Sequence, residues 1–320
     1  MKADASNGYE GLDSGKKAVP RKGGWFRMIS ILMFLSLAAA YLLYAGGCSS
    51  LYYYPDSVRY QDPRVNGFEY ESGFLEVEKG QKVHYWYFPS RGGPAKAVVL
   101  HFHGNAQNIS SHYSLSSWMA NYGYDVMIFD YRGYGQSDGK PDPESTYLDG
   151  LAALKEASRR AESMDVPIIV FAQSLGGAVA LRAIVDFPDK QRVALLVADS
   201  TFASYRGIVE RKARRILFSP LSVIVSCFFS NAKSPEHVLS NIAPIPVLVM
   251  HSRTDGVVEY VNGEEVFSGL KDPRHFYEIP YGGHLGWSSG GSSGVDRDLL
   301  EIMKLAVDVY GTGENPFASP

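Results

Sequence analysis

The chain has 320 residues, of which 45% are hydrophobic and 20% charged, and its 31 basic and 34 acidic residues leave a net charge of −3. This length suffices for one large domain with a substantial core, and the apolar and charged fractions are ordinary for a globular protein. The charge balance lacks the basic excess that attracts nucleic acid, so we expect no nucleic-acid partner.

The first 48 residues form a signal that is separate from the rest of the chain. The polar residues 1–27 place basic side chains next to an uncharged run, residues 28–47, which ends in small residues just before Cys48. A basic flank, an apolar run, small residues and a cysteine resemble a bacterial lipoprotein signal, in which Cys48 would carry the lipid and become the mature N-terminus. The run, about 20 residues, is also long enough to span a bilayer as an uncleaved anchor. In both interpretations the following domain is tethered to a membrane and lies outside the cytoplasm. We favour the lipoprotein.

Strand and helix patterns follow in regular alternation. After a linker at 49–66, alternating polar and apolar residues from 67 and at 82–87 predict antiparallel strands at the leading edge of a sheet. Short apolar runs then predict further strands at 97–102, 124–129, 166–171, 197–199, 244–251 and 276–280. Helical patterns lie at 110–121, 143–163, 176–186, 263–270 and 296–310. This order predicts an α/β domain over 67–310 with a mostly parallel sheet and helices on both faces, followed by a disordered tail at 311–320.

Residues 172–176, Ala-Gln-Ser-Leu-Gly, stand between a strand pattern and a helix pattern. A serine on such a sharp turn is a nucleophile elbow, and small residues flank it because the turn is crowded. Gly176 fits the usual G-x-S-x-G pattern, and Ala172 replaces the first glycine with the next smallest residue. The turn therefore makes Ser174 a candidate nucleophile, and the first backbone N–H of the helix, that of Leu175, a candidate oxyanion donor.

Two further motifs supply a candidate acid and base. Asp255 follows the strand at 244–251, and His284 follows the strand at 276–280. The order Ser174, Asp255, His284 is the one expected for an α/β-hydrolase triad. The turn after the strand at 97–102 begins His103-Gly104 and makes the backbone N–H of Asn105 the second oxyanion donor.

At these motifs the chain resembles the α/β-hydrolase superfamily over about residues 68–310. The resemblance lies in HFHGNAQN at 101–108, DYRGYGQSDG at 130–139, FAQSLGG at 171–177, HSRTDGVV at 251–258 and YGGH at 281–284. The chain is most similar to membrane-associated serine hydrolases with an HGNA turn, including members like acyl-protein thioesterases. The resemblance implies an eight-stranded sheet and cleavage of an acyl ester or thioester through an acyl-enzyme, with no cofactor.

Some alternatives stay open at this point. Asp199 also ends a strand and is a second candidate for the acid, although the position of Asp255 is commoner. Residues 201–241 are expected to form a short cap, whose basic and apolar stretches face lipid, hold an acyl chain or simply pack on the sheet. A peptidase of the same fold would need an acidic anchor in this cap, for which Glu210 and Glu236 are candidates. A non-catalytic, membrane-tethered scaffold is the other alternative, and the intact triad argues against it.

The remaining polar residues receive structural interpretations. His101 and His103 lie on one side of a strand, but the turn explains His103 more simply than a metal does, so we expect no metal site. If Cys48 is lipidated, Cys227 has no partner for a disulfide within the chain. We interpret Asp130 and Arg132 as a loop network, and the Gly/Ser-rich residues 285–294 as a flexible loop.

Overall fold

The structure is a computed structural model that describes residues 25, 27–34, 36–37, 53–78, 80–217, 219–288 and 290–318. The chain divides into two compact units, Met1–Gly46 and Gly47–Pro320. In the first unit, every described residue is helical and exposed. Across the described parts of the chain, no helix has both the length and the apolar character that crossing a bilayer requires. Cys48 and most of the expected apolar run lie outside the described residues.

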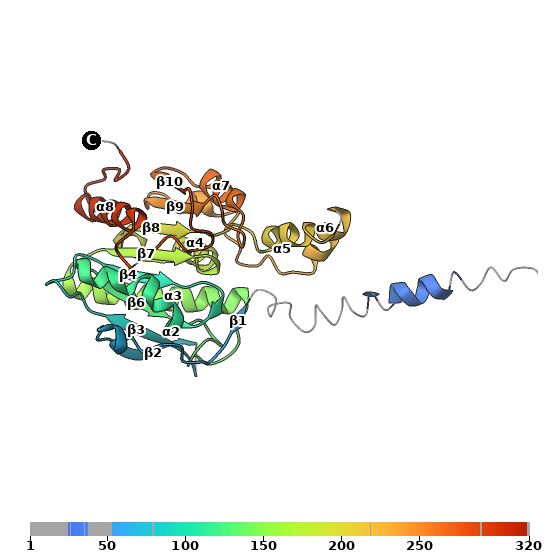
Figure 1. Ribbon diagram of the computed structural model, residues 1–320, viewed down its shortest axis with the longest axis horizontal. Coiled ribbons are helices and arrows are strands. Elements are labelled where there is room, and N and C mark those ends of the chain that lie inside the picture. Colours follow the sequence, from blue (N-terminus) through green and yellow to red (C-terminus); the bar gives the residue numbers. More distant parts are fainter. Residues whose placement is uncertain are drawn as a thin grey trace, which may run out of the picture. The chain divides into compact units, whose positions relative to one another are not determined.

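The second unit is built on an eight-stranded sheet with the order β10-β9-β8-β7-β4-β6-β3-β2 (Figure 1). β2 pairs antiparallel with β3, and β3 antiparallel with β6, whereas the remaining neighbours are parallel. The strands are β2 (Glu71–Glu78), β3 (Gln81–Phe88), β4 (Val98–Phe102), β6 (Asp125–Phe129), β7 (Ile168–Gln173), β8 (Val193–Asp199), β9 (Val247–Ser252) and β10 (Arg274–Ile279). The predicted mostly parallel sheet, with antiparallel strands at one edge, is confirmed.

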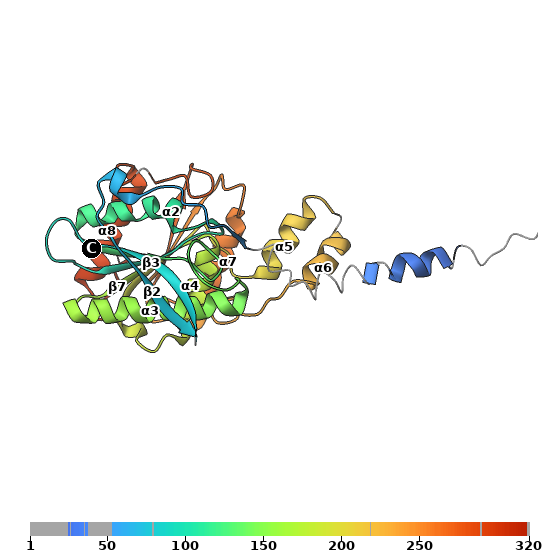
Figure 2. The ribbon, with the colours of Figure 1, turned by 90° about the horizontal axis from the view of Figure 1, so that it is seen from below.

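Helices cover both faces of this sheet. The α-helices of this unit are α2 (Ile109–His112), α3 (Pro143–Met164), α4 (Leu175–Asp186), α5 (Tyr205–Arg214), α6 (Ser219–Cys227), α7 (Tyr260–Gly269) and α8 (Gly294–Asp308), of which α5 and α6 lie in the cap between β8 and β9 and not over the sheet. Short 3-10 helices are η2 (Pro63–Asn66), η3 (Tyr113–Leu115), η4 (Ser117–Tyr122), η5 (Lys190–Arg192) and η6 (Leu239–Asn241). Figure 2 shows α3 on one side of the sheet and α2 and α8 on the other.

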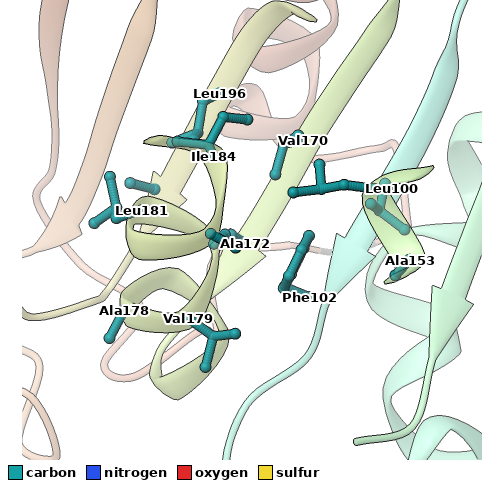
Figure 3. Packing of buried hydrophobic residues seen from close by; sticks show 14 of the residues in the cluster. Leu100, Phe102, Ala153, Val170, Ala172, Ala178, Val179, Leu181, Ile184 and Leu196 are labelled. Carbon is teal, nitrogen blue, oxygen red and sulfur yellow. The ribbon is translucent and has the colours of Figure 1, made fainter. Parts of the chain in front are cut away.

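Two hydrophobic cores hold these layers together. β4, β7, β8 and β9 are buried at every position, as expected for strands covered on both faces. In one core, apolar side chains of α3 and α4 pack against the sheet, and Figure 3 shows Val179 of α4 on the side of Phe102 and Ile184 beside Leu196. In the other core, α8 and η4 pack against the opposite face. Both cores leave the carboxyl ends of the central strands free to carry polar side chains.

The expected linker at 49–66 is wrong for its described part, because residues 53–66 belong to the folded unit. Tyr53 is buried, with its hydroxyl 3.2 Å from Thr146 Oγ1. β1 (Tyr54–Pro55) forms a two-stranded parallel sheet with β5 (Ala106–Gln107). This segment is held by backbone pairing to a distant turn, and such pairing leaves no local pattern in the sequence.

Two other boundaries also differ from the prediction. The single helix expected at 110–121 is broken into α2, η3 and η4. This stretch is rich in serine, and hydroxyls such as that of Ser111, which donates to Asn108 O at 3.0 Å, compete with regular helical bonding. The tail at 311–320 is not disordered in its described part, since Pro316 is buried and the Phe317 ring stacks on His275.

Candidate active site

Ser174 stands on the turn between β7 and α4 in a backbone conformation that L-residues rarely adopt. Its φ of 54° and ψ of −121° lie outside the ordinary helical and extended regions. Three hydrogen bonds hold it there: Ser174 N donates to Asp199 O at 2.9 Å, and Ser174 O accepts from Thr201 Oγ1 at 2.6 Å and from Gly177 N at 3.0 Å. The surrounding structure thus fixes a strained serine at the carboxyl edge of the sheet.

The crowding expected around this serine is present. A Cβ placed on Gly176 would lie 2.3 Å from Phe102 O, and one on Gly177 would lie 2.3 Å from Thr201 Oγ1. Both distances are far below van der Waals contact. The turn therefore requires glycine at these positions for space, because α4 passes close to β4 and to the residues after β8.

His284 joins the other two residues of the predicted triad. Its Nε2 lies 3.0 Å from Ser174 Oγ, and its Nδ1 lies 2.8 Å from Asp255 Oδ2. Ser174 is 7% exposed and the His284 side chain 18% exposed, whereas the Asp255 side chain is fully buried. These residues come from three turns that follow β7, β9 and β10, so the parallel sheet brings them together at one edge.

Asp255 is held as a carboxylate. Burial alone raises the pKa of its carboxyl, but the hydrogen bond and charge of His284 outweigh burial, so the pKa lies below its usual value. The backbone N–H groups of Val257 and Val258 donate to the other carboxylate oxygen at 2.8 and 2.9 Å and act in the same direction. The carboxylate is thus poised to accept from His284 Nδ1–H, which leaves Nε2 free to accept the serine proton.

Asp199, the alternative acid, has other partners. Its carboxylate accepts hydrogen bonds from Gln173 Nε2 at 2.8 Å, Trp287 Nε1 at 2.9 Å and Ser200 Oγ at 3.0 Å. Burial raises the pKa of the Asp199 carboxyl, while these hydrogen bonds oppose that rise. Among the described residues, no hydrogen bond joins Asp199 to His284, so the geometry favours Asp255 as the partner of the imidazole.

A buried polar chain behind the elbow was not predicted. The His101 ring lies 2.8 Å from Ser116 Oγ at Nδ1 and 3.0 Å from Gln173 Oε1 at Nε2. Burial holds the pKa of His101 well below its ordinary value, so the ring is neutral. Gln173 then links His101 to Asp199, and Asp199 links to Trp287. The only local signals were a glutamine inside the elbow motif and a tryptophan three residues after His284.

Trp287 also changes the interpretation of the loop after His284. Residues 285–294 were expected to be flexible, but Trp287 is 5% exposed and bonded to Asp199. At the end of the loop, Ser293 caps α8 through a capping box with Asp296. In its described part, the loop is anchored at both places, and this anchoring fixes the position of His284.

The turn expected to supply the second oxyanion donor is tied to the start of the folded unit. Asn105 Oδ1 accepts hydrogen bonds from Tyr54 N at 2.9 Å and from Tyr134 Oη at 3.1 Å. Asn108 Nδ2 donates to Val58 O at 2.8 Å and to Asp56 Oδ1 at 2.9 Å. We call residues 53–60 the N-terminal strap. In the described parts of the chain, the backbone N–H groups of Leu175 and Asn105 donate to no other protein group.

His103 and Asp130 form polar contacts that stabilise the same turn. His103 Nδ1 lies 2.7 Å from Gly104 O, and its Nε2 lies 3.4 Å from Asp130 Oδ1. Asp130 Oδ1 also accepts from Ile109 N at 2.8 Å. No group of three or more His, Cys, Asp or Glu residues with the geometry of a metal site occurs within the described ranges. His103 is therefore part of the turn's own hydrogen bonding.

Arg132 and the two glutamates considered as anchors have structural partners. Arg132 Nε donates to the buried Asp149 at 2.7 Å, which agrees with the predicted loop network. Glu210 pairs with Arg214 within α5. Glu236 accepts from Asn231 and lies 3.3 Å from His237. Both glutamates are thus already engaged within the protein.

The sheet order, the helices on both faces and the elbow after β7 define an α/β-hydrolase. The chain is 30% identical over 275 residues to the uncharacterized protein YfhR of Escherichia coli (strain K12), covering 85% of this chain and 92% of YfhR. It is also 30% identical over 250 residues to the alpha/beta hydrolase domain-containing protein WAV2 of Arabidopsis thaliana, covering 74% of this chain and 80% of WAV2. The chain belongs to the α/β-hydrolase family that includes these proteins.

Two further comparisons agree with this assignment. The model of the family described as serine aminopeptidase, S33, matches residues 93–223, which include Ser174. Among solved structures, the fold resembles the Pyrococcus furiosus esterase Pf2001, with a TM-score of 0.64 and 20% identity over 79% of this chain and 96% of the esterase. It also resembles a soluble variant of monoglyceride lipase from Saccharomyces cerevisiae, with a TM-score of 0.60 and 15% identity over 80% of this chain and 99% of the lipase. Both comparisons thus agree with an α/β-hydrolase family and fold.

Proposed function

We propose that the protein is a serine hydrolase that cleaves carboxylic ester or thioester bonds through an acyl-enzyme intermediate. The observation that carries this proposal is the position of His284, which bridges Ser174 Oγ at 3.0 Å and Asp255 Oδ2 at 2.8 Å. A serine that only stabilised a turn would need neither a base nor a buried carboxylate behind that base. The contacts also argue against a non-catalytic scaffold.

The first half of the reaction forms the acyl-enzyme. His284 Nε2 takes the proton of Ser174 while Oγ attacks the acyl carbonyl carbon, and Asp255 stabilises the imidazolium that results. The backbone N–H groups of Leu175 and Asn105, which have no acceptor among the described residues, receive the oxyanion. His284 then returns the proton to the departing alcohol or thiol. Loss of one oxyanion donor typically raises the barrier by about 3 kcal/mol.

The second half releases the acid. Water loses a proton to His284 and attacks the acyl carbonyl of the ester on Ser174, and the same two N–H groups hold the new oxyanion. Collapse of this intermediate expels Ser174 Oγ, which regains its proton from His284. Every step uses the same three side chains, so a cofactor has no part in it.

Labelling by a fluorophosphonate probe tests the nucleophile. We expect the probe to label the full chain and Ser163→Ala, in which the hydroxyl removed is exposed and bonded only to Arg160 O. We expect no labelling of Ser174→Ala. Equal labelling of Ser174→Ala, or none of the parent chain, contradicts the proposal.

The bond that is cleaved calls for a panel of substrates. The likeness to an esterase and a lipase supports esters, and the thioester follows from the sequence resemblance to thioesterase-like members. The family description as an aminopeptidase favours a second candidate, a serine peptidase. Comparing acyl esters, acyl thioesters and aminoacyl amides separates the two, and we expect turnover of the first two classes. Faster turnover of the aminoacyl amides assigns the peptidase instead.

We further propose that the N-terminal segment tethers the enzyme to a membrane, with the catalytic unit outside the cytoplasm. The support is the basic flank, the uncharged run at 28–47 and the cysteine at position 48. Mass spectrometry of the mature chain is the test. A chain that begins at an acylated Cys48 is expected, an intact N-terminus in a membrane fraction assigns the uncleaved anchor, and an intact chain in the soluble fraction contradicts the tether.

A further inference from the structure

The second helix of the cap presents its apolar residues to the outside. α5 and α6 form a hairpin between β8 and β9, which Figures 1 and 2 show standing clear of the helices that cover the sheet. In α6, Ser222 and Ser226 are buried at 0% and 4% exposure. Val223 and Ile224, between them, are 42% and 54% exposed. This is the reverse of an ordinary surface helix, which buries its apolar stripe.

The same pattern continues on both sides of α6. Ile216, in the turn before the helix, is 86% exposed, and Leu221 and Phe228 are each 36% exposed. α5 and α6 pack against each other, and the buried residues of α6 include these two small serines. Leu221 and Ile224 are three residues apart and so are neighbours on one side of α6, and together with Ile216, Val223 and Phe228 they make up what we call the apolar patch of the hairpin.

The hairpin itself carries more basic than acidic side chains. Residues 205–228 contain five basic side chains and one acidic side chain, although the whole chain has a net charge of −3. Three of the arginines pair with glutamates, as Arg215 does with Glu259 at 2.6 Å. Arg206 and Lys212 are exposed and have no acidic partner among the described residues. Apolar side chains beside cations fit a membrane surface that contains anionic lipid.

The folded unit begins at the base of the hairpin. Tyr53 and Tyr205, the first residue of α5, are both buried and share a hydrogen bond between their hydroxyls. Cys48 precedes Tyr53 by five residues, which span at most about 18 Å when extended. α5 itself, with ten residues, is about 15 Å long. A lipid on Cys48 would therefore keep the base of the hairpin close to the bilayer. The tip of the hairpin could then reach the bilayer surface.

We propose that the α5–α6 hairpin docks on a bilayer containing anionic lipid, with the apolar side chains of α6 at the boundary between headgroups and acyl chains. This contact holds the carboxyl edge of the sheet, and with it Ser174, toward the membrane. The orientation of the hairpin toward the membrane rests on the tether proposed above. The contact between the hairpin and lipid is tested in a chain that lacks this tether.

Cys227 provides the probe, because it is an exposed thiol on α6. The full chain carrying Cys48→Ser is labelled at Cys227 with an environment-sensitive fluorophore and mixed with phosphatidylcholine vesicles, with or without phosphatidylglycerol. We expect a blue shift with phosphatidylglycerol vesicles that weakens at high salt, and quenching by brominated acyl chains. The proposal is overturned if the protein floats with the vesicles but the emission wavelength of the label stays the same as in water.

Matched variants assign the contact to the hairpin. Ile216→Ser with Ile224→Ser is expected to weaken the fluorescence-detected binding by about tenfold or more. Val65→Ser with Leu305→Ser is the control, since these side chains are 86% and 41% exposed elsewhere on the unit, and it is expected to bind like the parent. Equal thermal unfolding of both pairs shows that folding is unaffected. Equal binding by both pairs overturns the proposal.

Two outcomes separate this inference from its neighbours. A blue shift without vesicles that grows with protein concentration, together with a dimer in sedimentation that the hairpin variant abolishes, assigns the patch to a second copy of the chain and overturns the lipid contact. Loss of vesicle flotation in the hairpin variant, while the parent keeps its blue shift, shows that the chain carrying Cys48→Ser binds the vesicles through the hairpin and supports the proposal.

Discussion

Ser174 shows how much of the site depends on the backbone around a single residue. A non-glycine residue at φ 54° and ψ −121° carries a strain of about 1–3 kcal/mol, which the neighbouring hydrogen bonds must outweigh. The bonds from Thr201 and to Asp199 O come from the loop after β8 and from its last residue. The end of β8 and the loop after it therefore hold Ser174 in position. The same turn also brings α4 within contact distance of β4.

Gly176→Ala tests this close packing. The new Cβ would lie 2.3 Å from Phe102 O and 2.5 Å from His103 O, which are backbone atoms that cannot rotate away. We expect urea unfolding to show a loss of about 3 kcal/mol, the upper end of the usual cost of overpacking. Gly256→Ala is the control, because nothing lies within 4 Å of its added Cβ. Equal stabilities of the two variants would refute this account of the elbow.

The two aspartates near the site are expected to differ in what they do. Asp255→Asn removes the charge behind His284 and should lower kcat by about 10⁴-fold with little change in KM. Asp199→Asn keeps an oxygen for Gln173 and Trp287 and should lower kcat by only about tenfold. Steady-state kinetics on one acyl ester checks both values. A larger effect of Asp199→Asn than of Asp255→Asn would make Asp199 the acid.

The sequence predicted the three side chains that meet at the candidate site but not the residues that position them. Ser174, Asp255 and His284 each sit in a short motif at the end of an apolar strand, so pattern and chain order together find them. The bond from Trp287 to Asp199 joins residues 88 positions apart. Neither residue has a local feature that depends on the other, so only the folded chain brings this contact to light.

At the scale of elements, the N-terminal strap links the start of the folded unit to the proposed oxyanion turn. Tyr54 N and Tyr134 Oη share Asn105 Oδ1, and β1 pairs with β5 just beyond it. Residue 105 thus has two separate tasks. In the proposed mechanism its backbone N–H receives the oxyanion, whereas its side chain accepts hydrogen bonds from Tyr54 of the strap and from Tyr134.

Asn105→Ala separates these tasks, because it keeps the backbone N–H and removes the acceptor. We expect kcat to fall by about tenfold to a hundredfold, since one oxyanion donor loosens without being lost, while KM changes little. Asn121→Ala is the control, because its amide bonds only the exposed Arg91, at 3.2 Å. A change in KM alone, or none in either constant, would show that the strap does not position the turn.

For the whole molecule, the pattern of covered strands was the strongest signal in the sequence. β4, β7, β8 and β9 read as apolar runs because helices cover them on both faces. The boundaries were predicted less well. Tyr53 and Phe317 pack on the unit through contacts with residues far along the chain, and a lone aromatic residue in a polar stretch does not indicate its partner.

The stability of the folded unit is expected to respond to acid through its buried histidines. Burial lowers the pKa of His112 to about 4 and that of His101 well below its usual value. Unfolded histidine has a pKa of about 6.5, so below this pH the unfolded chain binds protons that the folded chain does not. Stability from His112 is therefore present above pH 6.5 and is lost as pH falls toward 4.

Two buried aspartates act in the opposite direction over the same range. Burial raises the pKa of Asp149 to about 7, against the pull of Arg132, and burial also raises that of Asp199. The carboxyl of an unfolded aspartate has a pKa of about 3.9, so the stability that these two groups contribute to the folded unit is lost as pH rises above that value. The total pH dependence is thus a partial cancellation. The contribution of one histidine is isolated by comparing the free energy of unfolding of a variant that lacks it with that of the parent chain.

His112→Gln supplies that difference. Its free energy of unfolding, measured in urea relative to the parent chain, should rise between pH 7 and pH 4 by up to about 3 kcal/mol, because the variant no longer loses the stability that depends on a neutral ring at position 112. Asn121→Ala is the control, because it removes no titrating group, and its difference from the parent should stay flat over the same range. A flat difference for His112→Gln as well would mean that the ring takes up a proton equally well in the folded and unfolded chains, and that the packing of His112 beneath the oxyanion turn does not keep it neutral.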